Sequence, residues 1–164
     1  MLDDDHRYME YALREAERAL EIGEVPIGCV IVSEGQIVGK AHNQRELLQD
    51  PTAHAEILAI TQAAAHYKSW RLEGAKLYVT LEPCAMCAGA IILARIAEVY
   101  FGAHDPKAGM CGSLMNLLED SRFNHNPRLF SGLMAEECGR LLTNFFRRIR
   151  EDAANHPKPG PNRN

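Results

Sequence analysis

The sequence predicts one α/β domain in which a five-stranded mixed sheet lies between two layers of helices. Short apolar runs that are typical of strands alternate with longer segments whose apolar residues recur at helical spacing. Near the middle of the chain a strand, a helix and a further strand follow each other closely, which is typical of a parallel crossover. The 164 residues suffice to bury a core without disulfide bonds. No internal repeat or linker divides the chain, so we expect one domain over residues 1–150.

The chain begins with a predicted helix and a predicted hairpin. From about residue 5 to residue 22, apolar side chains recur at helical spacing among charged neighbours; aspartates that can act as N-caps precede them and Gly23 follows. Residues 27–32 and 36–41 are strand-like runs separated by three turn-forming residues, which favours an antiparallel hairpin.

A second helix is predicted after the polar loop 43–52. Thr52 or a neighbour can act as its N-cap, and the helix should run to about Tyr67. The residues expected on its buried side are Ile57, Leu58, Ile60, Thr61 and Ala64.

The predicted crossover covers residues 77–103. Residues 77–81 form a short apolar strand, Pro83 begins a helix that runs to about Arg95, and residues 99–103 form the next strand. Ligands in such folds gather at the carboxyl ends of parallel strands, so the start of this helix is expected at a binding site. Its apolar stripe consists of Cys84, Cys87, Ala88, Ile91 and Ile92.

The last third of the chain should contain a loop, two short elements and a final helix. Residues 103–112 are rich in turn formers, and a short helix over 113–119 and a strand over 128–134 are predicted. A final helix is expected over 135–150, with the stripe Cys138, Leu141, Leu142, Phe145 and Ile149. The proline-rich segment 151–164 has little to bury and is predicted to be a disordered tail.

Two short motifs predict a catalytic metal site. Cys84 and Cys87 lie three residues apart at a predicted helix start, where both thiols face one side and the helix dipole favours thiolates. His54 would be a third ligand. Three protein ligands leave one position of a tetrahedral zinc ion open for water, which is typical of catalytic sites.

Glu56 extends this interpretation to a reaction. A carboxylate two residues from a ligand can reach a metal-bound water without binding the metal itself. Zinc lowers the pKa of bound water to near 7, and a nearby carboxylate can carry the proton to a leaving amine. The motifs therefore indicate hydrolytic deamination. A redox dithiol would have no use for His54, and a structural zinc site would need a fourth Cys or His at matching spacing.

Composition limits the partners and the compartment. Lys and Arg number 18 against 22 Asp and Glu, a net charge of -4, so any nucleic-acid site must be local. Five cysteines make an odd count, the N-terminus is acidic where a signal peptide would be basic, and no apolar run approaches the length of a membrane span. We therefore expect a reduced, cytoplasmic protein with no membrane partner.

Three stretches carry a resemblance to a known family. They are DPTAHAE at 50–56, TLEPCAMCAGA at 80–90 and GMCGSL at 109–114. The chain resembles the cytidine deaminase-like superfamily and, within it, the bacterial tRNA-specific adenosine deaminases, over about residues 7–150. His-x-Glu followed by Pro-Cys-x-x-Cys is the known signature of zinc deaminases, the group to which this family itself belongs. One departure is Met110, where a smaller residue is more usual.

The resemblance implies a cytidine deaminase-like fold and a specific reaction. The reaction is hydrolysis of adenosine to inosine at the wobble position of a tRNA anticodon, with an arginine tRNA as the expected substrate. His54, Cys84 and Cys87 match the ligands of one Zn²⁺ per subunit, and Glu56 matches the proton shuttle. The positions that match substrate-binding residues of the family are Asn43, Ala55, Asp105, Lys107, Asn124, Phe145, Phe146 and Arg148.

The resemblance also implies a homodimer, and the predicted helix 83–95 favours it because its apolar residues cover more than one face. Two alternatives remain at this point. A free-base deaminase such as guanine deaminase would share the whole zinc argument. A non-catalytic RNA-binding protein on the same fold would normally lose Glu56 or a ligand, and this chain retains all four residues.

Overall fold

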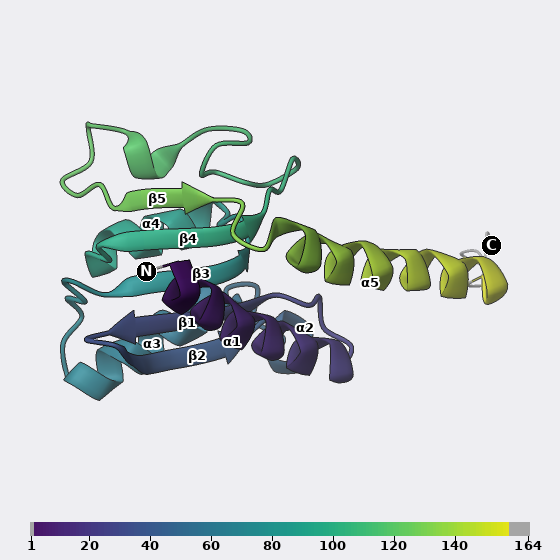
Figure 1. Ribbon diagram of the computed structural model, residues 1–164. Helices are drawn as coiled ribbons and strands as arrows, with labels where there is room; N and C mark the ends of the chain where they lie inside the picture. Colours follow the sequence, from purple (N-terminus) through teal and green to yellow (C-terminus); the bar gives the residue numbers. More distant parts are fainter. Residues whose placement is uncertain (1, 158–164) are drawn as a thin grey trace, which may run out of the picture.

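A five-stranded sheet forms the centre of the computed structural model, which describes residues 2–157 (Figure 1). The strand order is β2-β1-β3-β4-β5. β1 pairs antiparallel with β2 and with β3, whereas β3, β4 and β5 are parallel. The predicted mixed sheet and its first hairpin are confirmed. The bounds of the strands are β1 Gly28–Ser33, β2 Gln36–His42, β3 Lys76–Leu81, β4 Glu98–Ala103 and β5 Arg128–Ser131.

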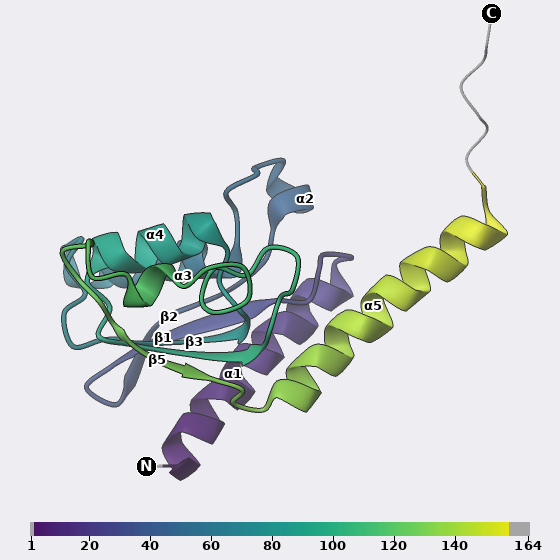
Figure 2. The ribbon, with the colours of Figure 1, turned by 90° about the horizontal axis from the view of Figure 1, so that it is seen from above.

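Helices cover both faces of the sheet, as the three-layer prediction requires. In Figure 2, α3 (Ala55–Tyr67) and α4 (Ala85–Ala94) lie on one side, and α1 (Leu2–Glu21) and α5 (Ala135–Asn155) on the other. The C-terminal end of α5 extends beyond the body of the fold. None of the helices within residues 2–157 has the length and apolar character needed to cross a bilayer.

Two apolar cores follow from the alternation of side chains along the strands. In β1, Cys29 and Ile31 point into the core beneath α3 and α4, while Val30 and Val32 point into the core beneath α1. β1, β3 and β4 are buried on both faces, which explains why their sequences read as continuous apolar runs. The second core contains a stack in which Tyr100 lies between Tyr78 and Phe130, with ring centroids 4.7 and 4.6 Å apart.

The buried side of α3 differs from the prediction. Ala55, Glu56, Ala59 and Ala63 are buried, while the larger Ile57, Leu58 and Ile60 are half-buried and Thr61 is exposed. The cause lies on the neighbouring strand, where Gly39 approaches the backbone of Ala59 so closely that a β-carbon would overlap its carbonyl oxygen. Such an approach admits only small side chains between α3 and β2, so the alanines face inward.

Several element boundaries also differ. The predicted loop 43–52 contains the short helix α2 (Arg45–Leu48), and the predicted helix 113–119 shrinks to the 3-10 turn Leu117–Glu119. The strand predicted over 128–134 ends at Ser131, because the chain turns at Gly132 with a φ of 86°. α5 continues to Asn155, so the prediction of a disordered tail is wrong for 151–155, and residues 158–164 lie outside the described part.

Glu98 supports the end of the sheet where the three parallel strands begin. Its carboxylate is buried, accepts a hydrogen bond of 2.7 Å from Tyr100, and pairs with Lys76 and Arg128 from the two neighbouring strands. Burial alone would raise the pKa of Glu98, but the Tyr100 hydrogen bond and the two cations outweigh it and lower this pKa below its usual 4.5.

We therefore predict that Glu98→Gln destabilises the fold in a pH-dependent way. A carboxylate with a lowered folded-state pKa stabilises the protein above the unfolded value near 4.5, and this contribution is lost as the pH falls through the folded-state pKa. The variant should be less stable than the wild type by about 1–3 kcal/mol at pH 7, and the difference should shrink below about pH 4.5. Urea unfolding across pH measures it, and a difference that stays constant with pH would contradict the account.

Candidate active site

The site is built where α3 and α4 begin, and a histidine and a cysteine occupy the two N-cap positions. His54 precedes α3 and Cys84 precedes α4, and neither side chain bonds to the backbone of its own helix. A typical N-cap side chain would accept such a bond, so both side chains are left free to point toward each other. Of the predicted candidates, Thr52 or a neighbour, the N-cap position falls on His54 and not on Thr52 itself. Thr52 instead donates to Asp50 at 2.8 Å in the turn before His54.

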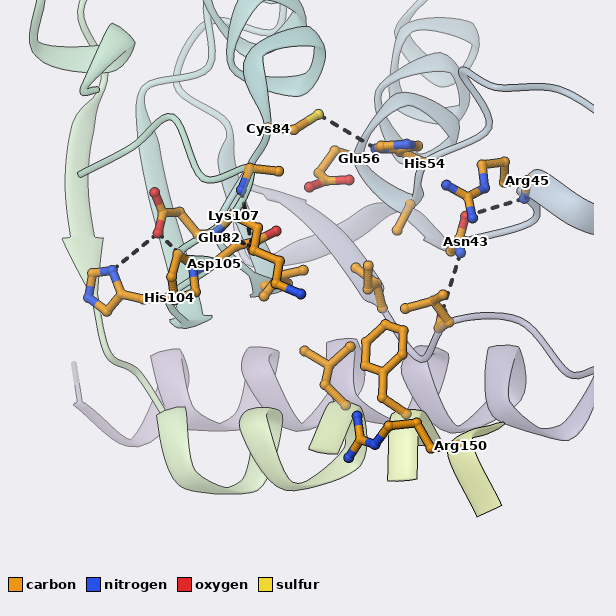
Figure 3. Close-up of a pocket in the computed structure, with 18 residues that line it drawn as sticks. Asn43, Arg45, His54, Glu56, Glu82, Cys84, His104, Asp105, Lys107 and Arg150 are labelled. Atoms are coloured by element: carbon orange, nitrogen blue, oxygen red, sulfur yellow. Dashed lines mark hydrogen bonds and ion pairs between the residues drawn. The ribbon is translucent and has the colours of Figure 1, made fainter. Parts of the chain in front are cut away.

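Three possible ligand atoms meet at this point. The Nδ1 atom of His54 lies 3.7 Å from Cys84 Sγ and 3.6 Å from Cys87 Sγ (Figure 3 draws the first contact). All three atoms lie within 4.8 Å of one another, and they form the one such metal-ligating group among the described residues. Zinc bonds of about 2.0–2.3 Å would place tetrahedral ligand atoms about 3.3–3.8 Å apart. The two nitrogen–sulfur distances fit that requirement, so these residues can hold a metal ion.

The pKa values of the two thiols are shifted in opposite directions. The hydrogen bond from Cys87, with a further one from His54, overcomes the effect of burial and lowers the pKa of Cys84 to about 4. The same bond to Cys84, together with burial, raises the pKa of Cys87 far above its usual value. The hydrogen bond between the two sulfurs therefore favours the thiolate on Cys84 and the thiol on Cys87. A metal that binds both sulfurs must displace the proton of Cys87.

Glu56 lies in the first turn of α3, next to His54 and Cys84 in the wall of one cavity. Its side chain is 4% exposed, and its carboxylate oxygens are not part of the metal-ligating group. Burial raises the pKa of Glu56, although the backbone and the neighbouring His54 act in the opposite direction. A carboxyl group with a raised pKa exchanges protons closer to neutral pH, which suits a general acid or base.

A cavity of about 630 Å³ opens in front of this cluster, a size typical of small-molecule sites. Figure 3 shows Asn43 and Arg45 on one side of it, Asp105 and Lys107 on another, and Arg150 of α5 facing them. The sequence-predicted residues that line the cavity are His54, Cys84, Glu56, Asn43, Ala55, Asp105, Lys107 and Phe146. The structure thus brings together residues from five separate parts of the chain.

Three predicted substrate-binding residues lie outside the cavity. Asn124 is exposed in the loop before β5, and Arg148 is exposed on α5. Phe145 is half-buried and makes an edge-to-face contact with Phe146, with ring centroids 5.4 Å apart. The assigned roles of these three residues stay predictions.

Asn43 and Asp105 have structural partners within the cavity walls. Asn43 accepts a hydrogen bond from the backbone of Arg45 at 3.2 Å and donates one to the carbonyl of Val25 at 3.4 Å. Asp105 accepts bonds from the backbone N–H groups of Lys107 and Ala108 at 3.1 and 3.2 Å. Both side chains are thereby fixed in place at the cavity surface.

Sequence reasoning missed several residues of the site. Arg45, His104 and Glu82 line the cavity, and Glu24 is buried beside it and accepts a bond of 2.6 Å from the N–H of Leu47 in α2. Glu82 stands directly before Pro83-Cys84, so its position in the motif was a signal that could have drawn attention to it. Nothing local in the sequence marks Glu24 or His104.

Comparison with known proteins gives a consistent family. The family model for MafB19-like deaminases matches residues 3–150. A tRNA-specific adenosine deaminase of Bacillus subtilis is 54% identical over 150 residues, which cover 92% of this chain and 93% of that protein. A tRNA-specific adenosine deaminase of Aquifex aeolicus is 48% identical over 145 residues, covering 88% of this chain and 95% of that protein.

Solved structures agree with the fold. A structure from a study of A-to-I editing by tRNA deaminases at the wobble position of transfer RNA superposes with a TM-score of 0.80 at 46% identity, covering 83% of this chain and 99% of that chain. A guanine deaminase from Nitrosomonas europaea has a TM-score of 0.76 at 20% identity, covering 85% of this chain and 83% of that one. The second likeness concerns the fold alone.

The unusual titration of Cys84 can be tested with an alkylating reagent. In chelator-treated protein, the alkylation rate of Cys84 should be nearly constant from pH 6 to pH 8, because a thiol with a pKa of about 4 is fully ionised there. The rate of an ordinary thiol rises about tenfold per pH unit in that range. Peptide mass spectrometry distinguishes Cys84 from the buried Cys29 and Cys138. Cys87→Ala removes the hydrogen-bond donor and should restore a pH dependence; a steep dependence in the wild type would contradict the assignment.

Proposed function

The chain belongs to the family of tRNA-specific adenosine deaminases in the cytidine deaminase-like superfamily, and we propose that it converts adenosine to inosine at the wobble position of a tRNA anticodon. The observation that carries this proposal is the group His54, Cys84 and Cys87 at the base of a cavity, with the buried Glu56 beside it. We further propose that the substrate is an arginine tRNA and that the protein acts in the cytoplasm, as the resemblance implies.

The proposed cofactor is one Zn²⁺ ion per subunit, held by His54, Cys84 and Cys87. One nitrogen and two sulfur donors suit zinc, and the nitrogen–sulfur distances of 3.6 and 3.7 Å fit a tetrahedral arrangement. When bound, zinc supplies the acidification of a water molecule that makes hydrolysis possible near pH 7.

Glu56 is proposed to move the proton. Its carboxylate accepts a proton from the attacking water and delivers it toward the amino group that leaves C6 of the adenine ring. One water is consumed and one ammonia is released, so Glu56 ends the cycle in the form in which it began. The burial that raises the pKa of Glu56 makes its carboxylate a stronger base toward the attacking water. Asn43, fixed between Val25 and Arg45, is proposed to orient the nucleoside.

A nucleic-acid substrate is supported by the charge at the cavity rim. Phe146 and Arg150 of α5 line the cavity, and Arg147 and Arg148 are exposed on the same helix. On a protein of net charge -4, this cluster provides a local site for phosphates beside a stacking surface. We propose that Asn124, Phe145 and Arg148 contact parts of the RNA that lie outside the cavity.

Apolar side chains on the α4 side of the sheet support a homodimer. Leu93 of α4 is 70% exposed, and Leu114 and Met115 in the loop before the 3-10 turn are each 55% exposed. The helix α4 contacts that turn, so these side chains belong to neighbouring elements. Large apolar groups left in solvent favour burial against a second copy of the chain.

The homodimer proposal predicts a sedimentation mass of twice 18.3 kDa at micromolar concentration. Leu93→Glu should shift the protein toward the monomer, because it places a charge on the apolar surface. Ile22→Glu changes an exposed residue of similar size at the end of α1 and should leave the mass unchanged. A monomeric wild-type protein would remove the proposal.

Replacing Glu56 tests its role in proton transfer. Glu56→Gln preserves size and burial but cannot accept a proton, so we expect activity to fall by about two to four orders of magnitude. Zinc content should stay at one ion per chain, measured by elemental analysis. A zinc-free Glu56→Gln protein would make Glu56 a ligand instead, and an active one would remove it from catalysis.

The substrate itself is tested by direct comparison. Purified protein should deaminate an anticodon stem-loop with a wobble adenosine, measured by inosine detection after nuclease digestion. The same adenosine within a base-paired duplex should react far more slowly, because the base must leave the stack to reach the cavity. If the protein deaminates free guanine efficiently and leaves the stem-loop untouched, the tRNA proposal is wrong.

A further inference from the structure

Glu82 is a buried carboxylate that the proton-transfer chemistry does not use. Glu82 follows the last residue of β3 and directly precedes Pro83 and Cys84. Its side chain is inaccessible to solvent. Residues 104–113 wrap around it. Its Oε1 atom accepts bonds from His104 Nδ1 at 3.2 Å, from the N–H of Asp105 at 3.1 Å and from the hydroxyl of Ser113. Its Oε2 atom accepts bonds from the N–H groups of Cys111 and Ser113, each at 3.0 Å.

These bonds join two parts of the site. The loop 104–113 supplies Asp105, Lys107 and their neighbours to the cavity wall, as Figure 3 shows. The backbone of Glu82 itself lies two residues before Cys84. Two backbone bonds reinforce the connection: Glu82 donates to Ala103 at 2.8 Å and Met110 donates to Pro83 at 2.9 Å.

The fit between loop and carboxylate leaves no spare room. Gly109 passes so close to Glu82 that a β-carbon at that position would overlap the carboxyl group. Residues 104–113 therefore bind both carboxylate oxygens and also pack directly against the carboxyl group at Gly109. A buried carboxylate is costly unless its oxygens are fully hydrogen-bonded, and here the loop backbone supplies most of the donors.

We propose that Glu82 is a positioning residue that holds the loop 104–113 in register with the metal-binding turn and so fixes Asp105 and Lys107 at the cavity wall. A glutamine cannot replace it. Each carboxylate oxygen accepts at least two bonds, so either orientation of a glutamine amide would direct an NH₂ group at backbone N–H donors. A shorter aspartate would not reach the same donors.

The first measurement is hydrogen exchange, which does not depend on the proposed function. In Glu82→Gln, the N–H groups of Asp105, Cys111 and Ser113 lose a buried acceptor. The amides of the loop 105–113, apart from Pro106, should therefore exchange about tenfold to a hundredfold faster. The exchange of α3 should not change. Glu98→Gln is the matched control, because Glu98 is also a buried, hydrogen-bonded carboxylate but lies at the opposite end of the parallel strands. Unchanged exchange in the loop of Glu82→Gln would overturn the proposal.

The activity readout rests on the proposed function. With an anticodon stem-loop, Glu82→Gln should raise KM by about tenfold or more with a smaller change in kcat, while zinc content stays at one ion per chain. Glu98→Gln should leave both constants unchanged. Loss of zinc in Glu82→Gln would place the role of Glu82 in the metal site rather than in the loop and would overturn the proposal.

Gly109→Ala disturbs the contact between the loop and Glu82 by changing the loop instead of the carboxylate. It should reproduce the faster exchange of 105–113, and the double variant with Glu82→Gln should be no more affected than the worse single variant. Fully additive effects would mean that the two residues act independently, against the proposal. A wild-type protein inactive on stem-loops would refute the proposed function, yet the exchange data would still decide the role of Glu82.

Discussion

The structure depends on two helices that start next to each other, near the carboxyl end of the central strand β3, with their N-cap side chains unused for capping. His54 and Cys84 occupy these positions, and the 3.7 Å contact between them replaces the backbone bonds that caps usually make. The first backbone N–H groups of each helix therefore lack the side-chain acceptor that an N-cap usually provides. That cost is acceptable where the same side chains gain a metal, and the thiolate at Cys84 fits the positive end of its helix.

The sequence predicted what depends on short-range spacing. Cys84 and Cys87 lie on one face because three residues make nearly one helical turn, and the strand before them places both at the carboxyl end of β3. The crossover of β3, α4 and β4 and the hairpin of β1 and β2 are confirmed for the same reason. Each of these elements carries its own pattern of apolar residues and turn formers.

What the sequence did not predict depends on contacts between distant segments. The buried side of α3 consists of alanines because Gly39, on another strand, brings the backbones together. The path of the loop 104–113 depends on Glu82, whose burial no local pattern reveals. Propensity and periodicity describe single elements, and these features belong to pairs of them.

X-ray absorption at the zinc edge tests the central claim most directly, because it reports the ligands of the metal rather than the activity. The account predicts two sulfur neighbours at about 2.3 Å and two nitrogen or oxygen neighbours at about 2.0–2.1 Å, from Cys84, Cys87, His54 and water. The spectrum of Glu56→Gln should be the same. A third sulfur neighbour, or a ligand set that changes when Glu56 is replaced, would contradict a three-ligand site with a separate proton-transferring carboxylate.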